Sequence, residues 1–294
     1  MDTDFAQEPP ELHNQYDRDR VLQSYVQRRF SESTLKTIEP ELVDLGKKAG
    51  GELYDLQQED LDSEPTLTRW GPWGERVDEI EVTDVWQRAE TLAAERGVVA
   101  TAYEQEHGTK SRIHQMLLAY LFIPSTDMYG CPLAMTDGAT RTLLDSGNEE
   151  LIDEAVPHLT SRDPDAFWTS GQWMTELAGG SDVGRARTTA KKQDDGTWRL
   201  YGRKWFTSAI TANVALALAR PEVGPGGVRQ RPAGLPERRG RLLRLPPLDA
   251  AEHHRQRHRR VQLTRGGRVV SEPVDAVESG RDGREVRRPV LETG

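Results

Sequence analysis

The run Met174-Thr175-Glu176-Leu177-Ala178-Gly179-Gly180-Ser181-Asp182, followed further on by Gly202-Arg203-Lys204-Trp205-Phe206-Thr207, decides the fold of this 294-residue chain. The first run combines hydroxyl side chains with a Gly-Gly pair, and the second places a tryptophan close to a threonine. A flat ring ligand with a polar edge needs a closely approaching loop, short hydrogen-bond donors and an aromatic wall. The two runs together supply all three, whereas each run alone has a simpler explanation.

The first run offers neutral donors on a glycine loop. Thr175 has a hydroxyl and a backbone N–H, and Gly179 and Gly180 permit positive φ angles and a close approach of the backbone. Ser181 adds a short donor, and Asp182 can hold the loop through local hydrogen bonds. Neutral donors of this kind stabilise negative charge on the edge of a ligand ring. The alternative is an ordinary Gly-Gly-Ser-Asp turn.

The second run offers an aromatic face. Trp205 has a large flat ring system, and Thr207 supplies a donor near it. The alternative is a core tryptophan on a β-strand. We expect the first run to follow one strand and the second run to end another.

The apolar pattern predicts helices first and strands afterwards. The expected helices cover 18–29, 34–58 (with Pro40 interrupting or starting one), 84–98, 113–121, 132–146 and 149–159, and 66–76 is expected to be a loop. The expected strands are 167–172, 187–192, 197–202 and 214–219, the middle two forming a hairpin about Asp194-Asp195-Gly196. Helices followed by antiparallel strands, without βαβ alternation, define the α+β class.

Composition excludes several classes of protein. The formal net charge is −9, which argues against a nucleic-acid binder over the whole chain. Cys131 is the only cysteine, so no internal disulfide forms, and no CxxC or HExxH spacing predicts a metal site. No secretory signal and no membrane-length apolar stretch occurs, so we expect a cytoplasmic protein without a membrane span.

Residues 223–294 differ in composition from the rest of the chain. They contain 16 Arg and no Lys, Phe, Tyr, Trp, Ile, Asn, Met or Cys. The missing residues are mostly those with AT-rich codons, so we hypothesise that a GC-rich gene is read out of frame from about Glu222. The alternative is a genuine Arg-rich disordered tail, which could bind nucleic-acid phosphates but has no aromatic residue for base stacking.

The motif pair also resembles a known family. Thr-Glu-x-x-Gly-Gly-Ser-Asp, a hairpin and then Gly-x-Lys-Trp-x-Thr are similar to the middle β-domain of acyl-CoA dehydrogenases. The run from Arg69 to Glu79 with Trp86 after it, and Cys131-Pro132-Leu133-Ala134-Met135-Thr136, resemble more closely the branch of the adaptive-response proteins against alkylating agents. The resemblance covers about residues 10–222. It implies a helical N-terminal domain followed by an antiparallel β-barrel-type middle domain.

The resemblance implies FAD as the cofactor and an acyl-CoA or related thioester as the partner. Thr175 would hydrogen-bond the pyrimidine edge of the flavin, and Ser181 would contact its phosphate side and border the acyl-CoA channel. Trp205 would pack on the isoalloxazine, and Thr207 would lie near flavin N5. The cofactor-binding residues implied in this way are Met174, Thr175, Gly179, Gly180, Ser181, Trp205, Phe206 and Thr207.

The catalytic base is not among these residues. We interpret Glu176 as structural support, because the family takes its glutamate base, further FAD contacts and its oligomer core from a C-terminal helical bundle. No such bundle is recognisable after residue 222. We therefore expect an oxidoreductase of CH–CH groups, with α-proton abstraction and β-hydride transfer to flavin N5, that is truncated and inactive. The alternative is a non-catalytic, flavin-containing, DNA-associated protein of the alkylation-response type.

The expected domain organisation follows from these observations. An extended arm covers 1–18, a helical domain 19–160, an incomplete β-domain 161–222, and the Arg/Gly/Pro-rich segment 223–294. Intact relatives of this type are expected to be homo-oligomers.

Overall fold

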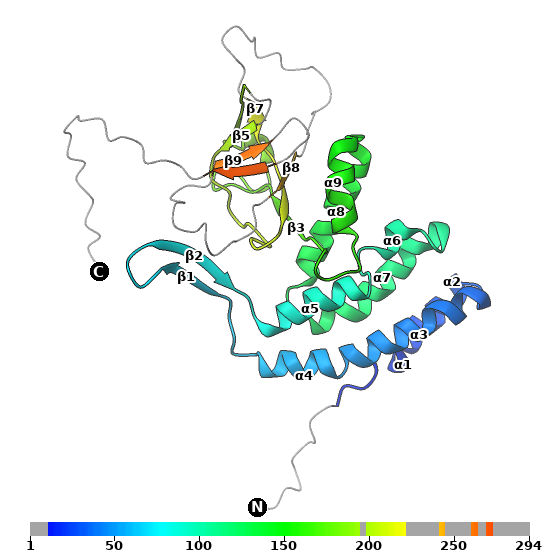
Figure 1. Cartoon of the computed structure of the whole chain (residues 1–294). Helices are drawn as coiled ribbons and strands as arrows, with labels where there is room; N and C mark the ends of the chain where they lie inside the picture. The colour runs from blue at the N-terminus through cyan, green and yellow to red at the C-terminus, as the bar shows by residue number, and fades with distance from the viewer. Residues whose placement is uncertain (1–10, 195–197, 222–240, 245–259, 264–268, 273–294) are drawn as a thin grey trace, which may run out of the picture.

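The computed structural model describes residues 11–194 and 198–221, together with the backbone of 241–244, 260–263 and 269–272 (Figure 1). Apart from one hairpin between the fourth and fifth helices, the helices come first in the chain and the strands follow, so the predicted α+β class is confirmed. Across these described ranges, no helix is both long and apolar enough to cross a membrane.

The helical domain packs around one apolar core. Its largest fully buried side chains include Ile38, Leu92, Leu118 and Phe122. The helices are α1 Gln15–Arg18, α2 Arg20–Arg29, α3 Glu32–Ala49, α4 Glu52–Glu59, α5 Asp84–Glu95, α6 Thr101–Glu104, α7 Ser111–Phe122, α8 Gly130–Ser146 and α9 Glu149–Leu159. The helices predicted from apolar spacing are therefore present, with ends that differ by a few residues.

Local capping explains several helix ends. The Thr83 side chain accepts a hydrogen bond from the Trp86 N–H at the start of α5, and Asn148 accepts one from Leu151 at the start of α9. Gly147 ends α8 with a φ of 64°, the left-handed conformation that glycine adopts without strain.

The expected arm 1–18 contains a helix. Asn14 caps α1 by accepting from the N–H groups of Tyr16 and Asp17, and its own amide donates to the Val43 carbonyl. Tyr16 is 2% exposed and lies against α3. The extended interpretation was wrong for Gln15–Arg18 because it gave no weight to this cap and this buried ring; residues 1–10 lie outside the described residues.

Pro40 does not interrupt its helix. α3 runs from Glu32 to Ala49 with Pro40 inside it. The proline removes one backbone donor and is costly in a helix interior. The fully buried stripe of Ile38, Leu42 and Leu45 holds the segment helical on both sides of it.

The segment expected to be a loop at 66–76 belongs to a hairpin. β1 Thr66–Trp70 pairs antiparallel with β2 Arg76–Glu81, and Gly74 has a φ of 83° in the turn. Every residue of β1 is exposed. The ribbon projects from the helices (Figure 1), so no burial pattern signalled the strands in the sequence.

The β-domain contains two sheets. One has the order β10-β9-β5-β4-β7 and the other β3-β6-β8. The strands are β3 Ser170–Trp173, β4 Thr189–Lys192, β5 Trp198–Tyr201, β6 Val214–Ala217, β7 Arg220–Pro221, β8 Arg241–Arg244, β9 Arg260–Leu263 and β10 Val269–Glu272. β4 and β5 form the predicted hairpin, whose turn residues 195–197 lie outside the described residues.

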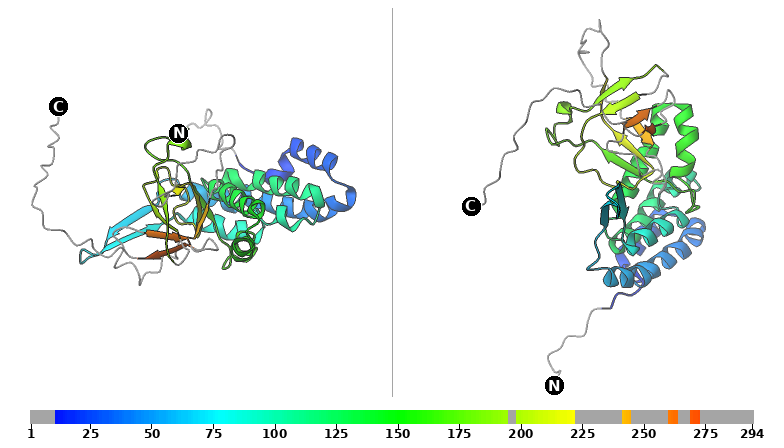
Figure 2. Two further views of the ribbon diagram at one scale, coloured as in Figure 1. Left: turned by 90° about the horizontal axis from the view of Figure 1, so that it is seen from above. Right: turned by 60° about the vertical axis from the view of Figure 1, so that its left-hand side comes forward.

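Two strand pairs correct the purely antiparallel expectation. β3 pairs in parallel with β6, and β4 pairs in parallel with β7. The completely buried β6 packs its Val214 and Leu216 against α8 and α9, which join the helical domain to the β-domain. Both views of Figure 2 place the α8–α9 pair beside these strands.

Three stretches of the segment 223–294 are strands. β8 pairs antiparallel with β6, β9 with β5, and β10 with β9. The remaining residues of this segment lie outside the described part of the chain, so the hypotheses of an out-of-frame or disordered tail concern residues that are mostly not described.

The contact of α1 with α3 predicts an unusual glycine substitution. A Cβ on Gly46 would lie 2.4 Å from Asn14 Oδ1 and 2.6 Å from the Tyr16 nitrogen. Although alanine favours helices, we expect Gly46→Ala to lower the free energy of unfolding by about 1–3 kcal/mol, because α1 must shift. Urea-induced unfolding followed by circular dichroism measures this change.

Gly138 in α8 is the matched control. A Cβ there would meet no atom within 4 Å. Gly138→Ala should raise the free energy of unfolding by about 1 kcal/mol through helix propensity alone. Equal gains from both substitutions would show that α1 does not pack on Gly46 as described.

Candidate functional site

The two motif runs meet in the β-domain. The first run follows the end of β3 at Trp173, as expected. The second run was expected to end a strand, but it begins only after β5 has ended at Tyr201. The Trp205 N–H donates to the Thr175 carbonyl at 3.0 Å. On the other side of Thr175, its methyl group lies 3.4 Å from where a Cβ of Gly180 would be. Thr175 therefore lies between the glycine loop and the tryptophan.

A buried ion pair between Glu176 of the first run and Lys204 of the second connects the two runs. Glu176 is 5% exposed and the only buried carboxylate among the described residues. Its oxygens accept hydrogen bonds from the Arg187 N–H at 2.5 Å, from the N–H and hydroxyl of Thr188 at 3.1 and 2.5 Å, and from Lys204 Nζ at 2.8 Å. Lys204 Nζ also donates to the Leu218 carbonyl at 2.7 Å. Each charge thus has several partners, which a buried ion pair requires.

These contacts determine the charge state of Glu176. Burial raises the pKa of its carboxyl, but the hydrogen bonds from Arg187, Lys204 and Thr188 outweigh burial and lower the pKa to about 2. The carboxylate therefore stays ionised at neutral pH with its oxygens occupied. This geometry agrees with the interpretation of Glu176 as structural support.

Lys204 and Thr188 were missed in the sequence. The available signal was a lysine in the second run opposite a glutamate in the first, two charges that would need each other if buried. Gly202 belongs to the same arrangement, because a Cβ there would lie 2.3 Å from Thr188 Oγ1. The first residue of the second run is therefore a glycine that leaves room for Thr188.

The glycine loop differs from the expectation in one respect. Neither Gly179 nor Gly180 has a positive φ. The Gly179 N–H donates to the Glu176 carbonyl at 3.0 Å, and a Cβ on Gly179 would approach the Asp182 carbonyl oxygen to 3.0 Å. The loop therefore needs a glycine at position 179 because of close packing, and not because of a left-handed backbone. The predicted local hydrogen bond of Asp182 is present, since its Oδ1 accepts from the Gly184 N–H at 3.1 Å.

Left-handed backbone occurs instead in and after the second run. Phe206 and Ala209 have φ values of 53° and 51°, which are unfavourable for residues with a Cβ. Trp205 is 42% exposed and Phe206 79% exposed, with ring centroids 6.0 Å apart at 85°. Trp205 is therefore not a core tryptophan. Its exposed ring can take a flat partner.

The hydroxyl groups of the motif are available to a ligand. Thr175, Ser181 and Thr207 are partly or fully exposed, and the described residues provide none of their hydroxyls with a hydrogen-bond partner. Met174 packs partly buried against the α8–α9 cluster and so supports the loop from inside. Neutral donors beside an exposed indole match the chemistry of a flavin ring, whose polar edge accepts hydrogen bonds and whose faces stack.

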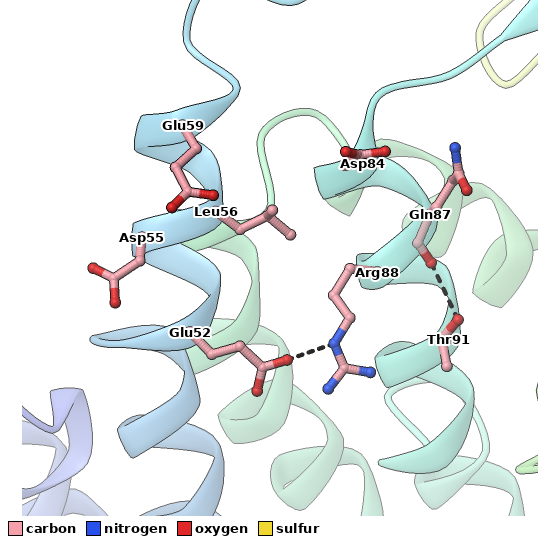
Figure 3. A pocket seen from close by; sticks show the side chains of 8 residues that line it. All are labelled: Glu52, Asp55, Leu56, Glu59, Asp84, Gln87, Arg88 and Thr91. Carbon is pink, nitrogen blue, oxygen red and sulfur yellow. Dashed lines mark hydrogen bonds and ion pairs between the residues drawn. The ribbon is translucent and has the colours of Figure 1, made fainter.

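A groove between α4 and α5 is a weaker candidate (Figure 3). It has a volume of about 550 Å³ and is lined by Glu52, Asp55, Glu59 and Asp84. Its one cation, Arg88, is paired with Glu52 at 2.5 Å. The remaining carboxylates would repel the phosphates of a dinucleotide or a coenzyme A thioester. We therefore place the candidate site at the motif runs.

Two family models match the chain. The adaptive response protein AidB N-terminal domain matches residues 7–166, and the acyl-CoA dehydrogenase middle domain matches residues 171–234. The second match extends beyond residue 223, where the composition changes.

Individual relatives agree. Acyl-CoA dehydrogenase family member 11 of Caenorhabditis elegans is 41% identical over 236 residues, which is 79% of this chain and 38% of that protein. AidB of Escherichia coli (strain K12) is 28% identical over 192 residues, 62% of this chain and 36% of that protein. The chain therefore spans less than half the length of these relatives.

Solved structures show the same fold. The crystal structure of C. elegans ACDH-11 in complex with C11-CoA has a TM-score of 0.71 and 41% identity, covering 76% of this chain and 38% of that chain. The apo form of Bd2924 has a TM-score of 0.71 and 43% identity, covering 74% and 44%.

The helical domain, the β-domain and the meeting of the two runs define an acyl-CoA dehydrogenase type of fold. The chain belongs to the acyl-CoA dehydrogenase family, with an AidB-type N-terminal domain followed by the middle domain.

The Glu176 contacts predict a pH-dependent stability. The folded pKa of about 2 lies below the ordinary 4.5, so the stabilisation is complete above pH 4.5 and disappears as the pH falls through about 2. It amounts to roughly 3 kcal/mol at neutral pH. The difference in unfolding free energy between the wild type and Glu176→Gln should therefore shrink from pH 6 to pH 2, measured by urea unfolding.

Asp153→Asn, at an exposed carboxylate of α9, is the control and should show no comparable change with pH. A wild type and a Glu176→Gln variant that differ by the same amount at every pH would contradict the depressed pKa.

Proposed function

We propose that the chain provides the flavin-ring part of an FAD site in an oxidoreductase of the acyl-CoA dehydrogenase type. The support is the hydrogen bond from the Trp205 N–H to the Thr175 carbonyl, which holds an exposed indole beside a loop of unpartnered donors. Both members of that contact were assigned to the flavin from the motif.

The individual residues have distinct roles in this proposal. Thr175 donates to the pyrimidine edge of the ring, and the Gly180 N–H lies in the same loop. The Gly179 N–H is already bonded to the Glu176 carbonyl, so Gly179 contributes tight packing. Trp205 and Phe206 supply the aromatic wall, and Thr207 a donor beyond it. Ser181 lies at the exposed end of the loop, where phosphates and an acyl-CoA could be reached.

Bound FAD would supply the hydride acceptor, and this chain's residues would bind and orient it. The relative ACDH-11 was crystallised with C11-CoA, so the proposed partner is an acyl-CoA thioester. Oxidation of a CH–CH bond also needs a base for the α-proton within hydrogen-bonding distance.

Glu176 cannot provide that base. Four donors occupy its oxygens, and a pKa of about 2 makes it a weak proton acceptor. Burial also raises the pKa of Glu90, but this residue lies on α5 of the helical domain and not in the motif runs. We therefore propose that the 294-residue chain binds FAD weakly and does not by itself dehydrogenate acyl-CoA.

Flavin binding tests the site. Trp205→Ala should raise the Kd for FAD about tenfold, because it removes an aromatic face worth about 1.4 kcal/mol. Thr175→Val should raise it about fivefold through one lost hydrogen bond. Quenching of FAD fluorescence on titration with protein measures both.

Trp73→Ala is the matched control, since Trp73 is 93% exposed in the β1–β2 turn. It should leave the Kd unchanged. If the Trp205→Ala and Trp73→Ala variants bind FAD equally tightly, the flavin does not bind at the second run.

Activity is a separate question. A dye-linked assay with FAD and acyl-CoAs of short, medium and long chain should give no turnover above a blank without enzyme. Turnover that disappears in Glu176→Gln, with FAD affinity unchanged, would make Glu176 the base and overturn the structural role.

A further inference from the structure

The indole of Trp173 connects the end of β3 to the turn that follows the second motif run. Its Nε1–H donates to the Ser208 carbonyl at 3.2 Å. The ring is partly buried and packs against Ala217 of β6, as do Trp198 and Leu200 of β5. Trp173 therefore stands immediately before the first run in the chain and is bonded to the backbone immediately after the second.

A glycine two positions earlier leaves room for this indole. Residues 171 and 173 both belong to β3, and side chains two apart on a strand lie on the same face of the sheet. A Cβ on Gly171 would lie 2.7 Å from Trp173 Nε1 and 3.2 Å from the Ser208 carbonyl oxygen. The indole of Trp173 therefore lies back over Gly171, in space that a larger side chain would fill.

The turn at residues 205–209 has a strained backbone. Phe206 and Ala209 have left-handed φ angles, and such a conformation persists only where the surrounding structure determines it. One hydrogen bond within the turn runs from the Ser208 N–H to the Phe206 carbonyl at 3.0 Å. The turn therefore needs further contacts that hold it in place.

Two hydrogen bonds from the end of β3 and the start of the first run hold this turn. At its beginning, the Trp205 N–H donates to the Thr175 carbonyl at 3.0 Å. Near its end, the Trp173 indole donates to the Ser208 carbonyl. Because Trp173 and Thr175 are only two residues apart, one short stretch of chain fixes both ends of the turn.

We propose that Trp173 is a positioning residue for flavin binding. Its indole N–H fixes the strained turn, and the turn presents the Trp205 and Phe206 rings to the flavin. Trp173 acts through the Ser208 carbonyl and needs no contact of its own with the cofactor. The functional part of this inference rests on the proposed flavin site.

Limited proteolysis tests the turn without any flavin. Chymotrypsin cleaves after aromatic residues, and Phe206 is 79% exposed, so cleavage there reports how often the turn opens. Trp173→Phe keeps an aromatic ring but removes the N–H donor. The loss of this hydrogen bond should speed cleavage after Phe206 about fivefold. Cleavage after Trp73, which is 93% exposed in the β1–β2 turn, is the internal control and should keep its rate.

Two further variants separate the hydrogen bond from the loss of packing. Trp198→Phe removes an indole from the same apolar cluster and should leave cleavage after Phe206 close to the wild-type rate. Gly171→Ala should displace the indole and speed cleavage as Trp173→Phe does, and the two changes combined should speed it little more than either alone. Equal rates for the wild type and Trp173→Phe, equal acceleration by Trp198→Phe, or full additivity with Gly171→Ala would each contradict the proposal.

Titration with FAD tests the positioning itself. Trp173→Phe should raise the Kd about threefold, which is less than the effect of Trp205→Ala, because the stacking ring remains and only its orientation is loosened. At saturating FAD, the flavin fluorescence should also be less quenched than in the wild type. A role in stability alone would lower the free energy of unfolding and change neither value, so a wild-type Kd and wild-type quenching in Trp173→Phe would overturn the proposal.

Failure of the flavin site itself gives a different result. In that case Trp205→Ala would leave the Kd for FAD unchanged, whereas the cleavage rates after Phe206 would still decide whether Trp173 holds the turn. Circular dichroism verifies that each variant is folded under the conditions of the digest.

Discussion

The buried ion pair of Glu176 with Lys204 connects the first motif run to the second. A carboxylate that is 5% exposed is tolerated only when its charge is balanced and its oxygens are hydrogen-bonded, and here the backbone of Arg187 and both donors of Thr188 complete the set. Three chain segments distant in sequence are thereby brought to one point. Gly202 packs on Thr188, whose hydroxyl is one of the donors to Glu176.

The exposed aromatic pair depends on that connection. Left-handed φ angles at Phe206 and Ala209 cost on the order of 1–3 kcal/mol each, and such conformations persist only where the surroundings determine them. Here the backbone before Phe206 is held by Lys204, bonded to Glu176 and to the Leu218 carbonyl, and by the Trp205 N–H on Thr175. Both rings are exposed in this conformation, whereas two successive side chains on a regular strand would point to opposite faces.

The sequence was informative where a signal is local. Apolar spacing located α2, α5, α7, α8 and α9, and the motif pair identified the family, because helix periodicity and turn residues act over a few positions. The exposed β1–β2 hairpin has no buried face and so no alternating pattern. The parallel pairing of Ser170 with Val214 joins residues far apart in sequence. The hydrogen-bond partners of Glu176 could not be predicted either, because the sequence alone does not show which charged groups the fold buries together.

The charge arrangement bears on the proposed role. If Lys204 were free, it would present a full positive charge to the candidate site; bound to Glu176, it leaves the loop with neutral hydroxyl and N–H donors only. Such donors stabilise a ring edge in more than one charge state, since none of them gains or loses a proton. The same pairing lowers the pKa of Glu176 and so removes it as a proton acceptor. In the proposed role, the Glu176–Lys204 ion pair therefore shapes the flavin site. It is also the reason why the catalytic base must come from outside the two motif runs.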